Sequence, residues 1–297
     1  MKTKLLSFCI LCSIALTFCS CEKPVFEENT KEEEKTSDKF NLTFDIAQFE
    51  QIPFAHAIAY SRSKDIKQVC TRLNFAVFND DTKIASVNQT SSDKNFGKIS
   101  VSLPAGTYRF LVLAHNCTGN ATITNLSKIK FPDNKITDTF YYCEEINVDA
   151  AASYQLELRR CVAQFKLIVE DAIPDEVKKM KFFYTGGSST FDAINGNGSV
   201  ASRQTEERNV KEEQRSGNAE FGVYTFPRDG KGELKVTVTA LNASDMLVKE
   251  QLFEHVPITK NRISLCKENF FGTPVNTNNN TFSFVVNDEW EQQEYTH

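Results

Sequence analysis

The chain has 297 residues, of which 40% are hydrophobic and 25% are charged, and its formal net charge at pH 7 is −5. This composition is typical of a soluble globular protein, and the length predicts about two domains. The acidic balance argues against nucleic acid as a partner, and after the N-terminal segment no apolar run is long enough to cross a bilayer as a helix.

The N-terminal segment has the pattern of a lipoprotein export signal. Lys2 and Lys4 precede an uncharged apolar run over residues 5–18, which is too short for a stable membrane span. The run leads into Phe-Cys-Ser-Cys at residues 18–21, which resembles the lipobox of bacterial lipoproteins, whose last cysteine receives the lipid. We therefore expect residues 1–20 to be a signal peptide and Cys21 to be the lipidated first residue of the mature chain. An ordinary secretory signal beside a chance cysteine is the alternative.

Residues 21–39 predict a lipidated, disordered acidic tether. Seven of the residues are acidic and few are apolar, so the segment cannot bury enough surface to fold. The acidic residues are Glu22, Glu27, Glu28, Glu32, Glu33, Glu34 and Asp38. An acidic stretch after a lipidated cysteine resembles the export signal of surface-exposed lipoproteins in Bacteroides-type bacteria. A charged spacer without a sorting role is the alternative.

Residues 40–159 predict a first series of strands. Phe40, Leu42, Phe44 and Ile46 alternate with polar residues, as in a half-buried strand. Residues 73–78 and 84–87 form an expected hairpin around the turn at 79–81. Further strands are expected over residues 99–103, 108–114, 140–148 and 154–158, and the strand over 108–114 is expected to be central because both its faces are apolar.

Residues 160–297 predict a second series. Strands are expected over residues 162–169, 180–184, 221–226, 234–241, 246–253, 258–265 and 282–286, with a hairpin turn at Gly230 and Gly232. The polar stretch 188–217 predicts a long exposed loop. Because no helix longer than about three turns is apparent, the pattern predicts an all-β chain with two tandem β-sandwich domains, residues 40–159 and 160–297.

The sequence predicts no catalytic, cofactor or metal site. Its histidines, His56, His115, His255 and His297, are isolated, and no hydrolase, phosphate-loop or dinucleotide motif occurs. A metal site or triad assembled only in space stays open. The pair Arg159-Arg160 is expected to be an ordinary inter-strand surface pair, with a protease processing site as the alternative.

The cysteines after Cys21 are Cys70, Cys117, Cys143, Cys161 and Cys266. Because their number is odd, at least one must stay free or pair between molecules, and their spacing matches no zinc or redox motif. We expect buried small side chains, with one or two bridges possible and no connectivity assigned.

Several segments together resemble a known family. They are the lipobox, Leu-Asn-Phe-Ala-Val-Phe-Asn at 73–79, Leu-Pro-Ala-Gly-Thr-Tyr at 103–108 with Asn116 beyond the next strand, and Val-Pro-Ile-Thr-Lys-Asn-Arg at 256–262 before Phe-Phe-Gly at 270–272. In this order the segments resemble the FimB-type fimbrial lipoproteins, anchor or accessory members of the fimbrillin superfamily of Bacteroides-type bacteria. The resemblance runs from Cys21 to about Trp290 and rests on order and spacing.

The resemblance implies two transthyretin-like β-sandwiches, no enzymatic activity and assembly into a type V pilus at the outer membrane. Polymerising members lose the first strand with its lipid, and a strand of the next subunit fills the groove. Anchor members keep both. Here Phe40, Leu42, Phe44 and Ile46 would occupy the first-strand groove, and the partners would be other fimbrial subunits and the outer membrane.

Two alternatives remain open after the resemblance. A stalk or tip subunit would be cleaved after a basic residue that follows the first strand, with Arg62 and Arg72 as candidates. The chain would otherwise be a surface lipoprotein that binds a glycan or a host protein without polymerising.

Overall fold

The computed structural model describes residues 38–49, 66–272, 282–285 and 293–295, without the side chains of the last two ranges. All of them lie in one compact unit, Ser37–His297. Almost all the regular structure in these ranges is β-strand. The exceptions are the four-residue helix α1 (Ile66–Val69) and two 3-10 turns, η1 (Pro132–Asn134) and η2 (Glu212–Gln214).

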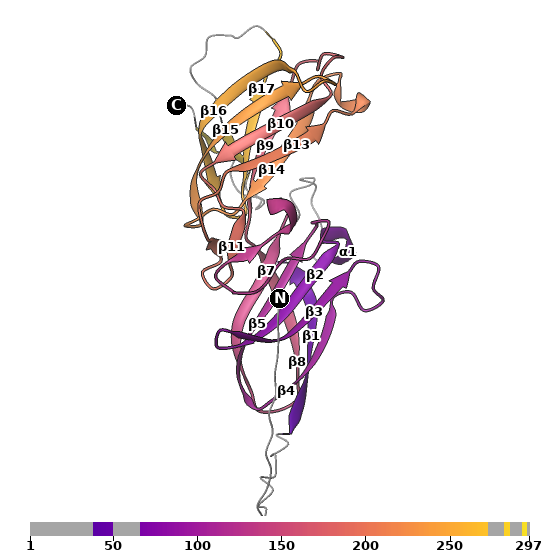
Figure 1. The fold of residues 1–297 in the computed structure, drawn as a ribbon, viewed down its shortest axis with the longest axis vertical. Coiled ribbons are helices and arrows are strands. Elements are labelled where there is room, and N and C mark those ends of the chain that lie inside the picture. Colours follow the sequence, from indigo (N-terminus) through magenta and orange to yellow (C-terminus); the bar gives the residue numbers. More distant parts are fainter. Residues whose placement is uncertain (1–37, 50–65, 273–281, 286–292, 296–297) are drawn as a thin grey trace, which may run out of the picture. The chain divides into compact units, whose positions relative to one another are not determined.

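The first half of the unit contains a seven-stranded sheet in the order β3-β2-β5-β7-β8-β1-β4. Its strands are β1 (Lys39–Phe49), β2 (Arg72–Asn79), β3 (Thr82–Thr90), β4 (Lys98–Pro104), β5 (Gly106–His115), β7 (Phe140–Val148) and β8 (Ala152–Arg160). β7 and β8 pair at only two positions, Phe140↔Arg160 and Tyr141↔Arg159. The sheet therefore divides into two layers, β3-β2-β5-β7 and β8-β1-β4, which pack a common hydrophobic core, the first core, between them (Figure 1).

The predicted strands of this half are confirmed. β2 and β3 form the expected hairpin, and Asp80 in its turn has φ 50°, a left-handed conformation that Asp tolerates. β5 lies between β2 and β7, and its residues 110–114 are buried on both faces. The apolar run over residues 108–114 therefore marked a central strand.

The second half contains two sheets, β13-β10-β15-β16 and β14-β9-β17-β18-β19, with the second core between them. The strands are β9 (Ala163–Val169), β10 (Lys179–Thr185), β13 (Gln204–Asn209), β14 (Ala219–Thr225), β15 (Lys231–Leu241), β16 (Leu247–Thr259), β17 (Ile263–Glu268), β18 (Phe282–Val285) and β19 (Gln293–Tyr295). The all-β sandwich fold predicted from the sequence is confirmed.

The two halves repeat one arrangement of strands. In chain order, β1, β2, β3, β4, β5, β7 and β8 correspond to β9, β10, β13, β14, β15, β16 and β17. β1 is parallel to β8 and antiparallel to β4, and β9 is in the same way parallel to β17 and antiparallel to β14. The division into domains at residues 39/40 and 159/160 stays a prediction.

The halves meet through their insertions. β6 (Ile129–Lys130) of the first half pairs with β11 (Thr190–Asp192) of the second, which also pairs with β12 (Asn197–Gly198). A third hydrophobic cluster draws residues from both halves. Within it, the ring centroid of Phe226 lies 5.4 Å from that of Phe131 and 5.0 Å from that of Phe191.

Two expectations for the second half were wrong. Residues 188–217 are not one exposed loop, because they contain β11, β12 and β13. The polar side chains that suggested a loop are partly buried and hydrogen-bonded, as where the Tyr184 hydroxyl donates to Glu206 at 2.9 Å. Gly230 does not close a hairpin of β14 and β15, because these strands lie in different sheets.

Candidate functional site

The first strand, β1, lies inside the first sandwich and not at its edge. It pairs with β4 along Lys39–Asp45 and with β8 along Leu42–Phe49. The predicted groove residues Leu42, Phe44 and Ile46 are buried at 0%, 1% and 7% exposure, and Phe40 is half-buried against the same core. The alternation of the sequence therefore places all four on the inward face of β1.

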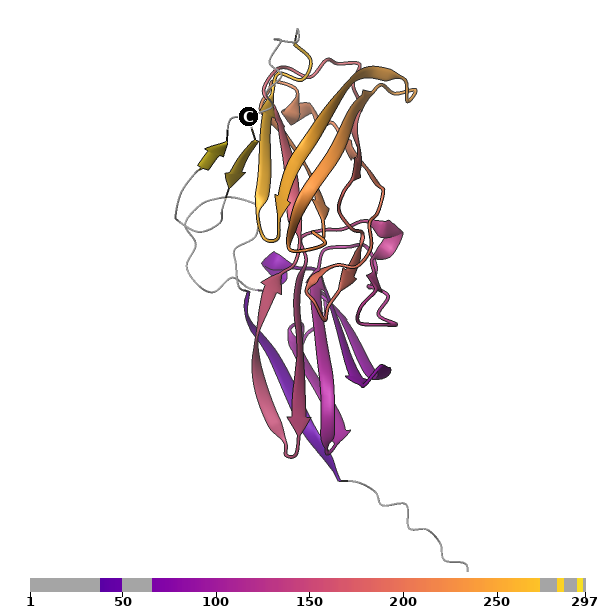
Figure 2. The same ribbon diagram turned by 90° about the vertical axis from the view of Figure 1, so that its left-hand side faces the viewer.

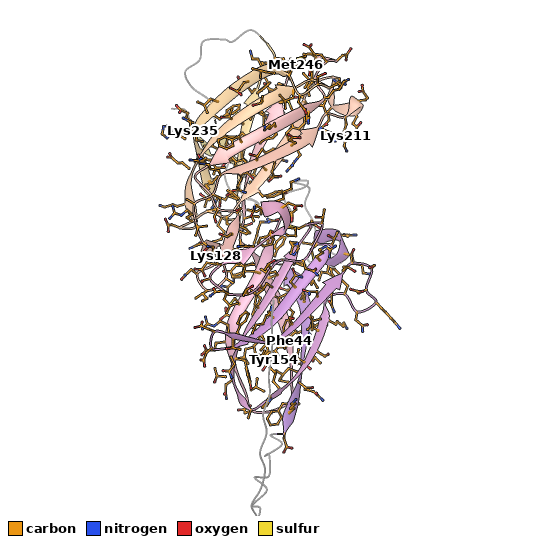
Figure 3. All side chains as sticks on the ribbon, viewed as in Figure 1. Phe44, Lys128, Tyr154, Lys211, Lys235 and Met246 are labelled. Carbon is orange, nitrogen blue, oxygen red and sulfur yellow. The ribbon has the colours of Figure 1, made fainter. Side chains whose placement is uncertain are left out.

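Phe44 packs against three aromatic rings, one of which, Tyr154, is labelled beside it in Figure 3. Its ring centroid is 5.0 Å from Phe110, 5.3 Å from Phe75 and 5.1 Å from Tyr154, with the Tyr154 ring stacked at 15°. Phe110 and Phe75 belong to β5 and β2 in the opposite layer, so β1 joins the two layers. Each buried side chain of this size stabilises the fold by about 1.5–3 kcal/mol.

The outward face of β1 is polar, and its side chains make exposed contacts with the neighbouring strands. The Thr43 and Ser153 hydroxyls hydrogen-bond at 2.6 Å, and Lys98 approaches Asp45 at 3.7 Å in an exposed pair. Exposed pairs of this kind contribute little. The inward apolar side chains and the two hydrogen-bond ladders therefore hold β1 in place.

This geometry gives β1 a specific chemical capability. Without it, β4 and β8 would each present a row of unpaired N–H and C=O groups beside an open apolar groove. An extended segment with the same alternation could satisfy both. The arrangement of β1 between β4 and β8 is therefore one that a strand of the same pattern could reproduce.

The other predicted site residues are placed only in part. Cys21 and Arg62 lie outside the described residues. Arg72 opens β2, where its guanidinium donates to the carbonyls of Cys117 (3.0 Å) and Thr118 (2.6 Å) and to Asn120 Oδ1 (3.2 Å). Cleavage after Arg62 or Arg72 stays a prediction.

The sequence did not indicate a structural role for Arg160, which was expected to lie on the surface. It is 1% exposed, not a surface arginine, and its guanidinium donates to both carboxylate oxygens of Asp138 at 2.7 and 3.0 Å. It also donates to Asn261 Oδ1 of the second half at 2.9 Å and lies 4.6 Å from the Phe140 ring centroid. Arg160 therefore ties the two halves together. The sequence holds no signal for this role, because Asp138 and Asn261 are 22 and 101 residues away.

His115 is buried at 0% exposure within a polar network. Its Nδ1 accepts from the Cys117 backbone N–H at 3.2 Å, so its Nε2 carries the proton and donates to Asn74 Oδ1 at 2.8 Å. Burial, with a smaller effect of the nearby Arg72 cation, lowers the pKa of His115 to about 4. The imidazole is therefore neutral at physiological pH. Its two hydrogen bonds connect the end of β5 to Asn74 of β2 and to the backbone of Cys117.

The five cysteines in the described ranges are unpaired, and four are buried. Burial raises the pKa of Cys70 and Cys266 to about 12 and that of the half-buried Cys143 to about 11. Because the thiolate is the reactive form, these thiols should react only slowly at neutral pH. The expectation of buried small side chains is confirmed, and the described part of the chain contains no bridge.

Within the described ranges, no group of three or more His, Cys, Asp or Glu side chains is arranged to hold a metal ion. No helix in the described part of the chain is long and apolar enough to cross a membrane.

Solved structures of similar fold come from Bacteroides-type bacteria. A candidate polysaccharide-binding protein (DUF1812) of Bacteroides thetaiotaomicron is 13% identical, with a TM-score of 0.48 over 84% of this chain and 96% of that chain. A candidate adhesin of Bacteroides ovatus is 11% identical, with a TM-score of 0.48 over 86% and 95%. The fimbrial anchor protein Mfa2 of Porphyromonas gingivalis is 11% identical, with a TM-score of 0.41 over 86% and 100%.

No curated protein matches the chain in sequence at a significant level. A protein family of unknown function, DUF6562, matches residues 30–297. Because this match covers most of the chain, the protein belongs to the DUF6562 family.

Proposed function

We propose that this protein is a non-enzymatic cell-surface lipoprotein that serves as a fimbrial subunit, most directly an anchor or accessory component. Lipid on Cys21 would hold it at the outer membrane, and strand addition would join it to neighbouring subunits. The observation that carries the proposal is the position of β1, a terminal strand that completes the first core between β4 and β8. The solved structures named above are too distant to carry it.

The strand position links anchoring to assembly. Arg62 and Arg72 both follow the end of β1 at Phe49, so cleavage at either would separate the lipidated terminus and β1 from the rest of the chain. The cleaved protein would then need a strand from another subunit to refill the groove. An anchor keeps its own β1 and its lipid together.

Mass spectrometry of the intact protein from its native membrane tests the anchor role. An acylated Cys21 on an otherwise whole chain supports it. A product without lipid that starts after Arg62 or Arg72 contradicts the anchor role and supports a stalk or tip subunit.

Rescue by a peptide tests strand exchange itself. A chain that starts at residue 66 lacks β1, and we expect a synthetic peptide of residues 38–49 to restore its thermal stability. The matched control peptide carries Phe44→Asp, which places a charge in the apolar groove and should abolish rescue. Equal rescue by both peptides would show that the groove does not select its strand.

A chain that keeps its lipid, never accompanies a fibre and binds a soluble glycan or host protein would favour the non-polymerising alternative. Purification of fibres from cells that produce the tagged protein separates the two functions.

A further inference from the structure

The repeat of the two halves exposes one difference, at β8 and its counterpart β17. β17 has partners on both sides, β9 in parallel and β18 antiparallel (Figure 2). β8 pairs with β1 on one side along Ala152–Leu158, but on its other side β7 reaches only Arg159 and Arg160. In the described part of the chain, no strand pairs with the far side of β8 from Ala152 to Leu158.

The first core is incompletely covered along this edge. The side chains of Tyr142 and Ile146 on β7 and of Ala152 and Tyr154 on β8 pack against the core but stay half-buried. β7 and β8 belong to opposite layers here, so these residues lie along the seam between them. A strand added to β8 would cover that seam.

A cavity of about 270 Å³ lies at one end of the seam. It is lined by residues 141–145 of β7, by Glu157 and Arg159 of β8, and by Arg109, Ala193 and Ile194. Arg109 is already paired with Glu145 at 3.0 Å. The other charged residues of the lining are Glu144, Glu157 and Arg159. Two carboxylates and one guanidinium leave the lining with one excess negative charge.

We propose that the free edge of β8 accepts an extended strand of a neighbouring subunit, antiparallel to β8, in the place that β18 occupies on β17. This second strand-addition site is distinct from the groove of β1 and rests on the proposed fimbrial function. The incoming strand pairs with β8, covers the half-buried seam with apolar side chains, and inserts a basic side chain into the cavity beside Glu144 and Glu157.

A polypeptide fits this edge better than a saccharide does. The side of β8 away from β1 presents backbone N–H and C=O groups in a row, and only another strand satisfies such a row along its length. In β-strand addition the ladder supplies affinity and a side-chain pocket supplies specificity. The edge and the cavity at its end provide both.

Hydrogen exchange of the full chain, free and within purified fibres, tests the site. In the free protein, the amides of β8 that point away from β1 should exchange rapidly. In the fibre we expect their exchange to slow by about tenfold or more. The outer edge of β3 (Thr82–Thr90) has the same free-edge character and serves as the internal control, with no change expected.

A charge-reversal pair tests the cavity. Glu157→Lys should reduce incorporation into fibres by about five- to tenfold, because it repels the incoming basic side chain. Glu213→Lys, in the 3-10 turn η2 of the second half, changes an exposed side chain; it is the matched control and should incorporate normally. Thermal melts of both variants verify that the fold is retained.

The outcomes separate this inference from the proposed function. A chain that enters fibres while β8 exchanges as in the free protein contradicts the inference alone, as does normal incorporation of Glu157→Lys. A soluble oligosaccharide that slows exchange in residues 141–145 would instead identify the cavity as a sugar site and overturn the inference. A chain absent from all fibres contradicts the proposed function and the inference with it.

Discussion

The two halves of the protein repeat seven strands in the same order, yet they complete their sandwiches differently. In the second half, the first strand, β9, follows directly from β8, and β17 pairs with β18. In the first half, β1 follows the N-terminal segment, and no strand among the described residues pairs with the equivalent edge of β8 along Ala152–Leu158. The same arrangement of strands is therefore extended by β18 in the second half, whereas in the first half it contains the proposed site of strand exchange.

The largest effect is expected from Phe44 and Phe165, which lie on the corresponding strands β1 and β9. Each is a buried phenylalanine on the first strand of its half. Replacement by alanine should cost about 3–5 kcal/mol in the free energy of unfolding for either, because each leaves a core cavity. Denaturant unfolding measures both. A loss below about 1 kcal/mol for Phe44→Ala alone would show that β1 is dispensable to the first core.

A loss of the same order is expected at the junction between the halves. Asp138→Asn leaves the buried Arg160 guanidinium without its carboxylate, which should cost about 3–5 kcal/mol. The more exposed ion pair of Arg109 and Glu145 provides the control. Glu145→Gln should lower the free energy of unfolding by less than about 1 kcal/mol. Equal losses at the two sites in urea unfolding would contradict the assignment of Arg160 as the tie between the halves.

Acid should distinguish the two described histidines, His115 and His255. The pKa of His115 falls to about 4 in the folded protein, whereas the unfolded value is 6.5, so the unfolded state takes up a proton first. Stability is therefore full above pH 6.5 and decreases as the pH falls toward 4, by about 3 kcal/mol in total.

The exposed His255 has the opposite sign. Its hydrogen bond to Glu233 raises its pKa, so its small contribution is present at low pH and is lost as the pH rises through the raised pKa. Unfolding titrations of His115→Gln and His255→Gln against pH would separate the two effects. An unchanged acid slope in His115→Gln would refute the buried-histidine explanation.

The smallest effect concerns thiol labelling. Cys143 is the least buried of the five described cysteines, and its pKa is raised to about 11, so it should react first with a thiol reagent but slowly at pH 7. The fully buried Cys161 should react only after unfolding. Time-resolved mass spectrometry checks the order, and rapid native labelling of Cys161 would contradict it.

The sequence determined where most strands lie, because a strand with one buried face needs only a local alternation such as Phe40, Leu42, Phe44 and Ile46. The resemblance to fimbrial lipoproteins, and not this alternation, then indicated the strand as the candidate site. The alternation failed over residues 188–217, where buried polar residues such as Glu206 mimic a loop, since their hydrogen-bond partners lie in other strands.

Only the tertiary structure decided which strands share a sheet, and hence that β1 lies between β4 and β8 while no described strand pairs with the far edge of β8 along Ala152–Leu158. It also buried Arg160 against Asp138 and Asn261. These features depend on contacts between residues far apart in the chain. Local periodicity records which face of a strand is apolar, but it does not record which neighbour covers that face.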